Sequence, residues 1–174
     1  MKDYKYIFME TKTITIERTF QLPVDIVWKA FSEAENMKKW WGPKEYTCPE
    51  FTNDFQVGGK YLGAMEDKDG NRTWSTGFYV EIIPEKRIVM TDSFSDSEGN
   101  ILAGSSINMP GEWPDVLLVT VEFQQHEDTT LFLLKHEGLP PESQADCIHG
   151  WQESLDKLEN IFRYYRETSN SLDE

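Results

Sequence analysis

The stretch that decides the fold is PPESQADCIHGWQESLDKLENIFRYY, residues 140–165. The two prolines suit the first turn of a helix, and apolar residues then recur at alternating steps of three and four, the spacing of one helix face. These apolar residues are Ile148, Trp151, Leu155, Leu158, Phe162 and Tyr165. The sequence therefore predicts a long C-terminal amphipathic helix whose apolar stripe needs a surface to pack on.

The middle of the chain reads as an antiparallel meander that supplies this surface. Turn signals at residues 69–70, 84–85, 98–100 and 127–128 separate segments rich in β-branched and aromatic residues. Period-two alternation predicts one apolar face. In the segment 73–83 it places on that face Trp74, Thr76, Phe78, Val80 and Ile82. The later segments add Ile88, Met90, Phe94, Leu117, Val119, Val121, Phe123, Phe132, Leu134 and His136.

A first strand and two short helices are predicted before the meander. Residues 14–20 alternate as a half-buried strand does, and the spacing of Val24, Val27, Trp28 and Phe31 indicates a helix after Pro23. A second short helix ends at residues 42–43, a Gly-Pro pair. We therefore expect an α+β helix-grip fold, a curved antiparallel sheet around the C-terminal helix. The expected boundaries are an extension at 1–12, the domain at 13–166 and a frayed tail at 167–174.

Composition and charge limit the function classes. The chain has 174 residues, a net charge of −14 and no apolar run near the ~20 residues of a membrane span. Because nucleic acids and anionic membranes require cationic surfaces, neither is an expected partner. The first dozen residues lack a secretory signal, so we expect a soluble cytoplasmic protein with Cys48 and Cys147 as free thiols. The cysteine spacing predicts no metal site, and no cofactor motif is present.

Catalytic signals are sparse in this sequence. It holds no nucleophile elbow, zinc-protease pair or dinucleotide fingerprint. His136 is predicted to point inward and its neighbour Glu137 outward, so the two cannot form a dyad. Asp54, Glu66 and Asp92 remain as carboxylates at strand ends, which are usually solvated. We expect no catalytic residue.

Four motifs, in order along the chain, resemble a known family. They are MKKWWGP at 37–43, DFQVGGKY at 54–61, HEGLP at 136–140 and GWQESL at 150–155. Together with the order of elements, they resemble the activator of heat-shock-protein-90 ATPase homologue-like proteins of the START-like superfamily, from about residue 14 to 162. The resemblance implies the helix-grip fold and a hydrophobic cavity between sheet and helix. Other superfamily branches bind lipids, hormones or polyketides, and a few are cyclases or dehydratases.

Strand phase, helix face and this resemblance together assign a set of residues to the space between sheet and helix. The predicted ligand-binding residues are Trp41, Phe55, Tyr61, Trp74, Phe78, Phe94, Trp113, His136 and Trp151. Such aromatic residues form either an ordinary core or the wall of a pocket, and we favour the pocket. The loop 107–114 either caps this pocket or is a crossover pinned by Trp113.

The opposite face of the sheet carries an unusual apolar group. Leu131 and Leu133 make their strand apolar on both faces, and Leu118 and Tyr79 are expected to join them. Because a soluble protein usually covers such a patch, we predict a homodimer.

The leading functional hypothesis is a non-enzymatic module that holds an apolar or aromatic small molecule in the cavity. One alternative is an interaction protein of the co-chaperone type that docks its acidic surface on a chaperone ATPase. The other is a cyclase- or hydrolase-like enzyme that uses a cavity histidine or acid.

Overall fold

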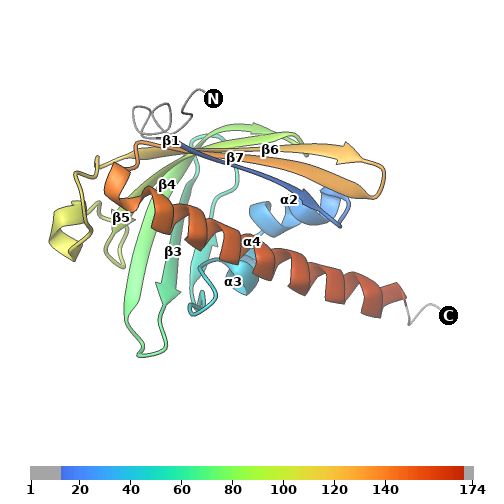
Figure 1. Ribbon diagram of the computed structural model, residues 1–174, viewed down its shortest axis with the longest axis horizontal. Coiled ribbons are helices and arrows are strands. Elements are labelled where there is room, and N and C mark those ends of the chain that lie inside the picture. Colours follow the sequence, from blue (N-terminus) through green and yellow to red (C-terminus); the bar gives the residue numbers. More distant parts are fainter. Residues whose placement is uncertain (1–12, 171–174) are drawn as a thin grey trace, which may run out of the picture.

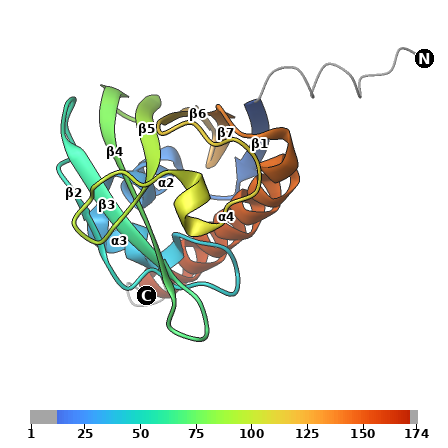
Figure 2. The ribbon, with the colours of Figure 1, turned by 90° about the vertical axis from the view of Figure 1, so that its left-hand side faces the viewer.

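The C-terminal helix lies across one face of the sheet, as its apolar stripe predicts. The computed structural model describes residues 13–170, and in it α4 spans Pro141–Asn170. Figure 1 shows α4 crossing the strands diagonally, and Figure 2 shows the sheet arching over it. The helix continues four residues into the segment predicted as a tail, whereas the predicted extension at 1–12 and residues 171–174 lie outside the described part of the chain.

Seven strands and three shorter helical segments make up the rest of the described chain. The strands are β1 (Thr13–Phe20), β2 (Phe51–Asn53), β3 (Lys60–Glu66), β4 (Arg72–Ile83), β5 (Arg87–Ser95), β6 (Leu117–His126) and β7 (Thr129–Glu137). The helical segments are α2 (Val24–Ser32), α3 (Ala34–Trp40) and the 3-10 turn η2 (Gly104–Ile107).

The sheet order is β1-β7-β6-β5-β4-β3-β2, with every neighbouring pair antiparallel. Strands β3 to β7 therefore form the predicted meander, and β1 and β2 close its two edges. The two short helices follow the first strand, and all helices of the described chain except η2 lie on the concave side with α4 (Figure 1). The predicted helix-grip fold is confirmed.

The predicted side-chain phase is correct in β5, β6 and β7 and wrong in β4 as far as Val80, which was expected inside and is 51% exposed. Tyr79, expected on the outer face, is 3% exposed and packs in the core, whereas Phe78, expected inside, is 49% exposed. The cause is a register shift between Tyr79 and Glu81, where Val80 forms a bulge. A bulge inserts one residue into a strand and so inverts the period-two alternation on one side of it.

The bulge reassigns the residues of β4 that precede it. Tyr79 pairs with Met90 and Ile82 with Ile88, so both face α4, although they are three positions apart. Counting back from Tyr79, Gly77 and Ser75 face inward, and Trp74, Thr76 and Phe78 face outward. Trp74 and Phe78 are therefore not on the concave side of the sheet, contrary to the prediction.

The core consists of two apolar clusters with a shared boundary residue. The larger one fills the space between the sheet, α2, α3 and the C-terminal half of α4, and includes Phe31, Trp40 and Leu158. The smaller one contains Ile14, Leu117 and Leu139. Trp151 packs against both clusters.

Polar contacts fix the C-terminal half of α4 on the sheet and on the loop before β2. Arg18 of β1 bonds Asp156 and Glu159 of α4 at 2.5 Å each. The Lys157 ammonium donates to the backbone oxygens of Pro43 at 3.2 Å and Tyr46 at 2.9 Å. The helix is thus held by charge-assisted bonds as well as by its apolar stripe.

Candidate functional site

A chain of polar side chains crosses the interior at the boundary between the two apolar clusters. The Tyr61 hydroxyl donates to Asp92 Oδ1 at 3.0 Å and also lies 3.1 Å from the backbone oxygen of Thr91. Asp92 Oδ2 lies 3.4 Å from His136 Nε2, and the Trp151 indole Nε1 donates to His136 Nδ1 at 3.2 Å. Tyr61, Asp92, His136 and Trp151, here called the polar chain, therefore link three strands to α4.

The sheet register places the members of the polar chain. Tyr61 comes from β3, Asp92 from β5 and His136 from β7, and each occupies an inward position of its strand. Gly77 faces Tyr61, and a Cβ there would lie 2.7 Å from the Tyr61 ring and 1.9 Å from the oxygen of Thr91. Only glycine at this position lets the phenol lie flat against the sheet and reach Asp92.

The polar chain fixes the protonation of its own members. Because an indole N–H only donates, His136 Nδ1 must accept, and the imidazole proton is on Nε2. Burial, followed by the charge of Asp92, raises the pKa of Tyr61 well above its usual value, so Tyr61 is a neutral donor. Both imidazole nitrogens already face protein groups, and neither offers a free lone pair to a substrate.

Aromatic rings surround this boundary. Trp41 lies edge-on to Trp151 with ring centroids 5.5 Å apart, and its centroid is 6.1 Å from that of Phe51. Phe51 stacks on Tyr61 at 5.9 Å. A Cβ at Gly63 would lie 2.6 Å from the Phe51 ring, so the absence of a side chain at Gly63 makes room for this stack.

The space between sheet and helices is almost completely filled. The enclosed cavity has a volume of about 10 Å³, room for about one water molecule, whereas ligand pockets usually measure about 300–1,000 Å³. It is lined by Phe31, Met37, Trp41, Phe51, Tyr61, Tyr79, Ile88 and Met90. The pocket favoured from the sequence is therefore closed in this structure, because side chains from α2 and α3 reach into the hollow of the sheet.

Three buried, inward-facing donors have no hydrogen-bond partner within the described residues. They are Trp41 Nε1, Ser75 Oγ and His136 Nε2. The separation of 3.4 Å between His136 Nε2 and Asp92 exceeds the usual range for an N–H···O bond. An unpaired buried polar group costs about 1–3 kcal/mol. The interior therefore leaves the hydrogen-bonding capacity of these three donors unused.

The structure brings together four of the nine residues assigned to the site from sequence. Trp41, Tyr61, His136 and Trp151 meet at the polar chain. Phe55 lies elsewhere in the main cluster, against Trp28 and Tyr79. Phe94 and Trp113 pack on each other at the smaller cluster, with ring centroids 4.9 Å apart. Trp74 and Phe78 lie on the outer face and are not part of this group.

Sequence reasoning missed Ser75 and gave Asp92 no place in the site. Asp92 alternates with Met90 and Phe94, so the phase of β5 alone would have placed its carboxylate inside. The position of Ser75 follows only once the bulge in β4 is known. Of the other two carboxylates considered, Asp54 accepts from Gln56 at the surface and Glu66 pairs with Arg72.

The loop after η2 is a pinned crossover. Trp113 Nε1 donates to the backbone oxygen of Pro110 at 2.9 Å, and the same oxygen accepts from the Ser143 hydroxyl at the start of α4, also at 2.9 Å. A Cβ at Gly104 would lie 2.8 Å from Trp113, so η2 packs directly on this indole. The loop is thus tied to both η2 and α4.

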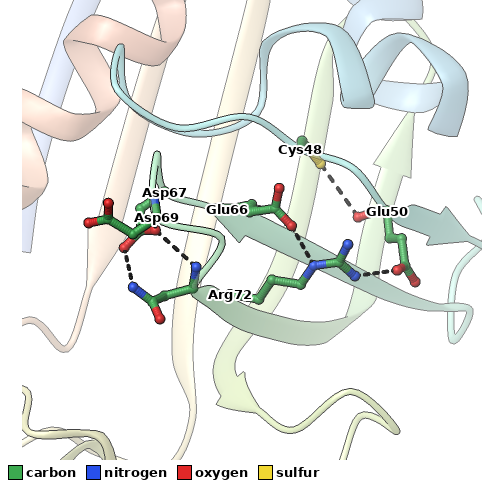
Figure 3. A network of polar contacts seen from close by, with 7 residues as sticks. Cys48, Glu50, Glu66, Asp67, Asp69 and Arg72 are labelled. Atoms are coloured by element: carbon green, nitrogen blue, oxygen red, sulfur yellow. Dashed lines mark hydrogen bonds and ion pairs between the residues drawn. The ribbon is translucent and has the colours of Figure 1, made fainter.

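A second polar network holds the β3–β4 hairpin (Figure 3). Arg72 bonds Glu66 at 2.7 Å and also contacts Glu50. Asp67 accepts from the backbone and side-chain nitrogens of Asn71 at 2.9 and 3.0 Å, which closes the turn. Because the carboxylates of Glu66 and Asp67 are paired in this way, the network stabilises the hairpin.

The described residues contain no group of three or more His, Cys, Asp or Glu side chains arranged to hold a metal ion. Within the same part of the chain, no helix is both long and apolar enough to cross a membrane.

Fold and site together define the class of protein: a helix-grip domain whose interior is divided by a polar chain between sheet and helix. Residues 21–163 match the family described as "Activator of Hsp90 ATPase homolog 1-like protein". The chain belongs to this family, which confirms the resemblance noted in the sequence.

Solved structures of bacterial proteins share the fold. A protein of Chromobacterium violaceum is 25% identical with a TM-score of 0.72, over 87% of this chain and 96% of that one. A protein of Arthrobacter aurescens is 21% identical with a TM-score of 0.75, over 90% and 88%. The AHSA1 protein of Silicibacter pomeroyi is 19% identical with a TM-score of 0.70, over 88% and 99%. No curated protein matches this chain.

Proposed function

We propose that this protein is a non-enzymatic binding module that takes an apolar or aromatic small molecule between the sheet and α4, at Trp151. The observation that carries the proposal is the presence of three unpaired buried donors, of which Trp41 and His136 lie beside the Trp151 ring. Aromatic faces bury a flat apolar ligand, and unpaired donors orient a polar group on it. Of the residues assigned from sequence, Trp41, Tyr61 and His136 are the proposed contacts, and Trp151 is the side chain that moves aside for the ligand.

Binding requires side chains to move, because the closed cavity holds about one water molecule. Trp151 is the side chain best placed to move. It is only partly buried, it lies between the two apolar clusters, and a single hydrogen bond to His136 holds its indole nitrogen. Breaking that bond costs about 1 kcal/mol net, which lowers the affinity about fivefold.

The expected affinity is modest. A ligand of about 20 heavy atoms at ~0.3 kcal/mol each gains ~6 kcal/mol, which corresponds to a Kd in the tens of micromolar. At ten times its Kd, such a ligand stabilises the folded state by about 1.4 kcal/mol and raises the Tm by roughly 3–5 °C.

The experiment is a thermal-shift screen with a library of apolar and aromatic compounds, followed by calorimetric titration of the hits. Trp151→Leu removes the indole that must move, so we expect hits to bind it about fivefold more tightly. Trp74→Leu is the matched control on the outer face and should leave their affinity unchanged. If no compound shifts the Tm of the wild-type protein or of Trp151→Leu, the proposal is wrong.

The co-chaperone alternative is supported by the family description and by the net charge of −14. An acidic surface favours docking on a basic patch, and such docking weakens with salt. The test is retention of a purified Hsp90-class chaperone at low salt and its release at high salt, together with the chaperone's ATPase rate. Absence of both retention and stimulation at low salt removes this alternative.

The enzymatic alternative has less support from the geometry. A cyclase or hydrolase that used His136 as a base would need a free imidazole nitrogen, but Nδ1 accepts from Trp151 and the Nε2 proton faces Asp92. Catalysis by His136 would therefore require Trp151 to leave first.

A further inference from the structure

The three buried donors share a chemical property that selects among ligands. The Trp41 indole can only donate, and the His136 imidazole presents N–H at Nε2 because its other nitrogen accepts from Trp151. The Ser75 hydroxyl donates freely. Of the acceptors on the polar chain, Asp92 Oδ1 and the oxygen of Thr91 face the Tyr61 hydroxyl, and Asp92 Oδ2 faces His136 Nε2 at 3.4 Å.

These donors belong to one region of the interior. Trp41 and His136 flank Trp151, with ring centroids 5.5 and 6.2 Å from it. Ser75 pairs with Gly63 across the sheet, and the Phe51 ring that packs over Gly63 lies against Trp41. A molecule that displaces the Trp151 indole would therefore meet the unpaired donors of Trp41 and Ser75, and it would release His136 Nδ1 as an acceptor.

Asp92 sets the charge preference. After burial, its charge is the next cause that raises the pKa of the Tyr61 phenol and of the Cys147 thiol. Two groups on different elements, β3 and α4, are thus kept neutral by burial and the same negative charge. An anionic ligand group would be disfavoured by the same two effects, burial and the negative charge of Asp92. The Asp92 charge would attract a cationic ammonium, but an ammonium only donates and would leave Trp41 Nε1 and Ser75 Oγ without an acceptor.

We infer that the ligand is an uncharged molecule with a hydrogen-bond acceptor oxygen, such as a ketone, ester or ether, on an apolar or aromatic frame. Trp41, Ser75 and His136 supply the donors to that oxygen. This inference rests on the proposed function and names the ligand class for the same site.

Four probes of matched size test the ligand class by titration, with the Kd measured from tryptophan fluorescence or calorimetry. They are 2-acetylnaphthalene, 2-isopropenylnaphthalene, 2-naphthoate and 1-(2-naphthyl)ethylammonium, which share the naphthalene ring and the number of non-hydrogen atoms and differ in the substituent. We expect the ketone to bind about tenfold more tightly than the isopropenyl compound, and both charged probes to bind more weakly than the ketone by about the same factor.

A pair of serine variants connects this preference to the named donors. Ser75→Ala removes an unpartnered inward hydroxyl and should reduce the ketone's advantage over the isopropenyl compound about threefold or more. Ser95→Ala is the matched control, because Ser95 is also buried and unpartnered but pairs with Trp74 on the outer face. Ser95→Ala should leave the ratio of the Kd values of the ketone and the isopropenyl compound unchanged.

The outcomes separate the two proposals. If the four probes bind equally well, or if a charged probe binds most tightly, the ligand class is wrong while the binding function stands. If Ser75→Ala and Ser95→Ala change the ratio equally, the assignment of the donors is wrong. If no probe binds, the proposed function fails, and the ligand class fails with it.

Discussion

The Trp151 indole donates a hydrogen bond to Nδ1 of His136 over 3.2 Å, and this bond joins α4 to β7 across the interior. It also fixes the imidazole proton on Nε2 and thereby determines what His136 offers to a ligand.

Replacing Trp151 by Phe removes this bond and leaves a buried acceptor unpaired. We expect the free energy of unfolding to fall by about 1–3 kcal/mol, measured by urea denaturation. Trp113→Phe is the matched control, since its indole bonds Pro110 near the surface and should cost less. An equal loss in both variants would show that the bond to His136 has no special role.

Adjacent residues of β4 test the position of the bulge. Tyr79→Ala empties a buried site and should lower the free energy of unfolding by about 3–5 kcal/mol, whereas Phe78→Ala, at a residue 49% exposed, should lower it by less than about 1 kcal/mol. Urea denaturation of the two variants gives the comparison. If Phe78→Ala were the more destabilising variant, the side-chain phase of β4 predicted from sequence would be right.

The fold could be predicted because the deciding signals are periodic. The stripe from Ile148 to Phe162 and the alternation in β5, β6 and β7 keep their phase and place their residues correctly, whereas Tyr165, the last residue of the predicted stripe, is 48% exposed. In β4 one extra residue at Val80 inverts the alternation, and nothing in that segment marks it. An apolar Phe78 and an apolar Tyr79 are equally good candidates for the inner face.

The candidate site was only partly predictable for a related reason. Trp41, Tyr61, His136 and Trp151 were assigned to the site because strand phase, helix face and the family resemblance place these side chains inward. Asp92 was discounted because acids at strand ends are usually solvated, yet here its side chain, 24% exposed, faces the buried Tyr61 and His136. That the cavity is closed could not be predicted, since it depends on how far Phe31 and Trp41 reach into the hollow.

Cys48 and Cys147 should make stability fall at alkaline pH. Burial is the main cause that raises the pKa of each thiol from 9.0 to about 11, so the folded state disfavours the thiolate. The resulting stability is complete below about pH 9 and is lost as the pH rises towards 11. The double variant Cys48→Ala/Cys147→Ala should lose less stability than the wild type over this window, measured by urea denaturation at each pH. Parallel losses in both proteins would contradict this account.

The predicted homodimer has a smaller candidate surface than the sequence suggested. Tyr79 is buried and does not belong to it, whereas Leu131 is 37% exposed and Leu118 and Leu133 are half-buried. If the dimer forms through this face, Leu131→Lys should convert it to monomer in sedimentation experiments. Val57→Lys, in an exposed position outside the strands, is the control. A wild-type monomer at micromolar concentration would end the dimer prediction.

The most direct test of ligand binding at Trp151 is a titration followed by NMR on the indole N–H signals. The chain has six tryptophans, so each indole serves as a local reporter. With 2-acetylnaphthalene as the ligand, the account predicts saturable shifts of the Trp41 and Trp151 signals, while the signal of Trp74 on the outer face stays unchanged. No shift up to the solubility limit of the ligand, or shifts confined to Trp74 and Trp113, would contradict it.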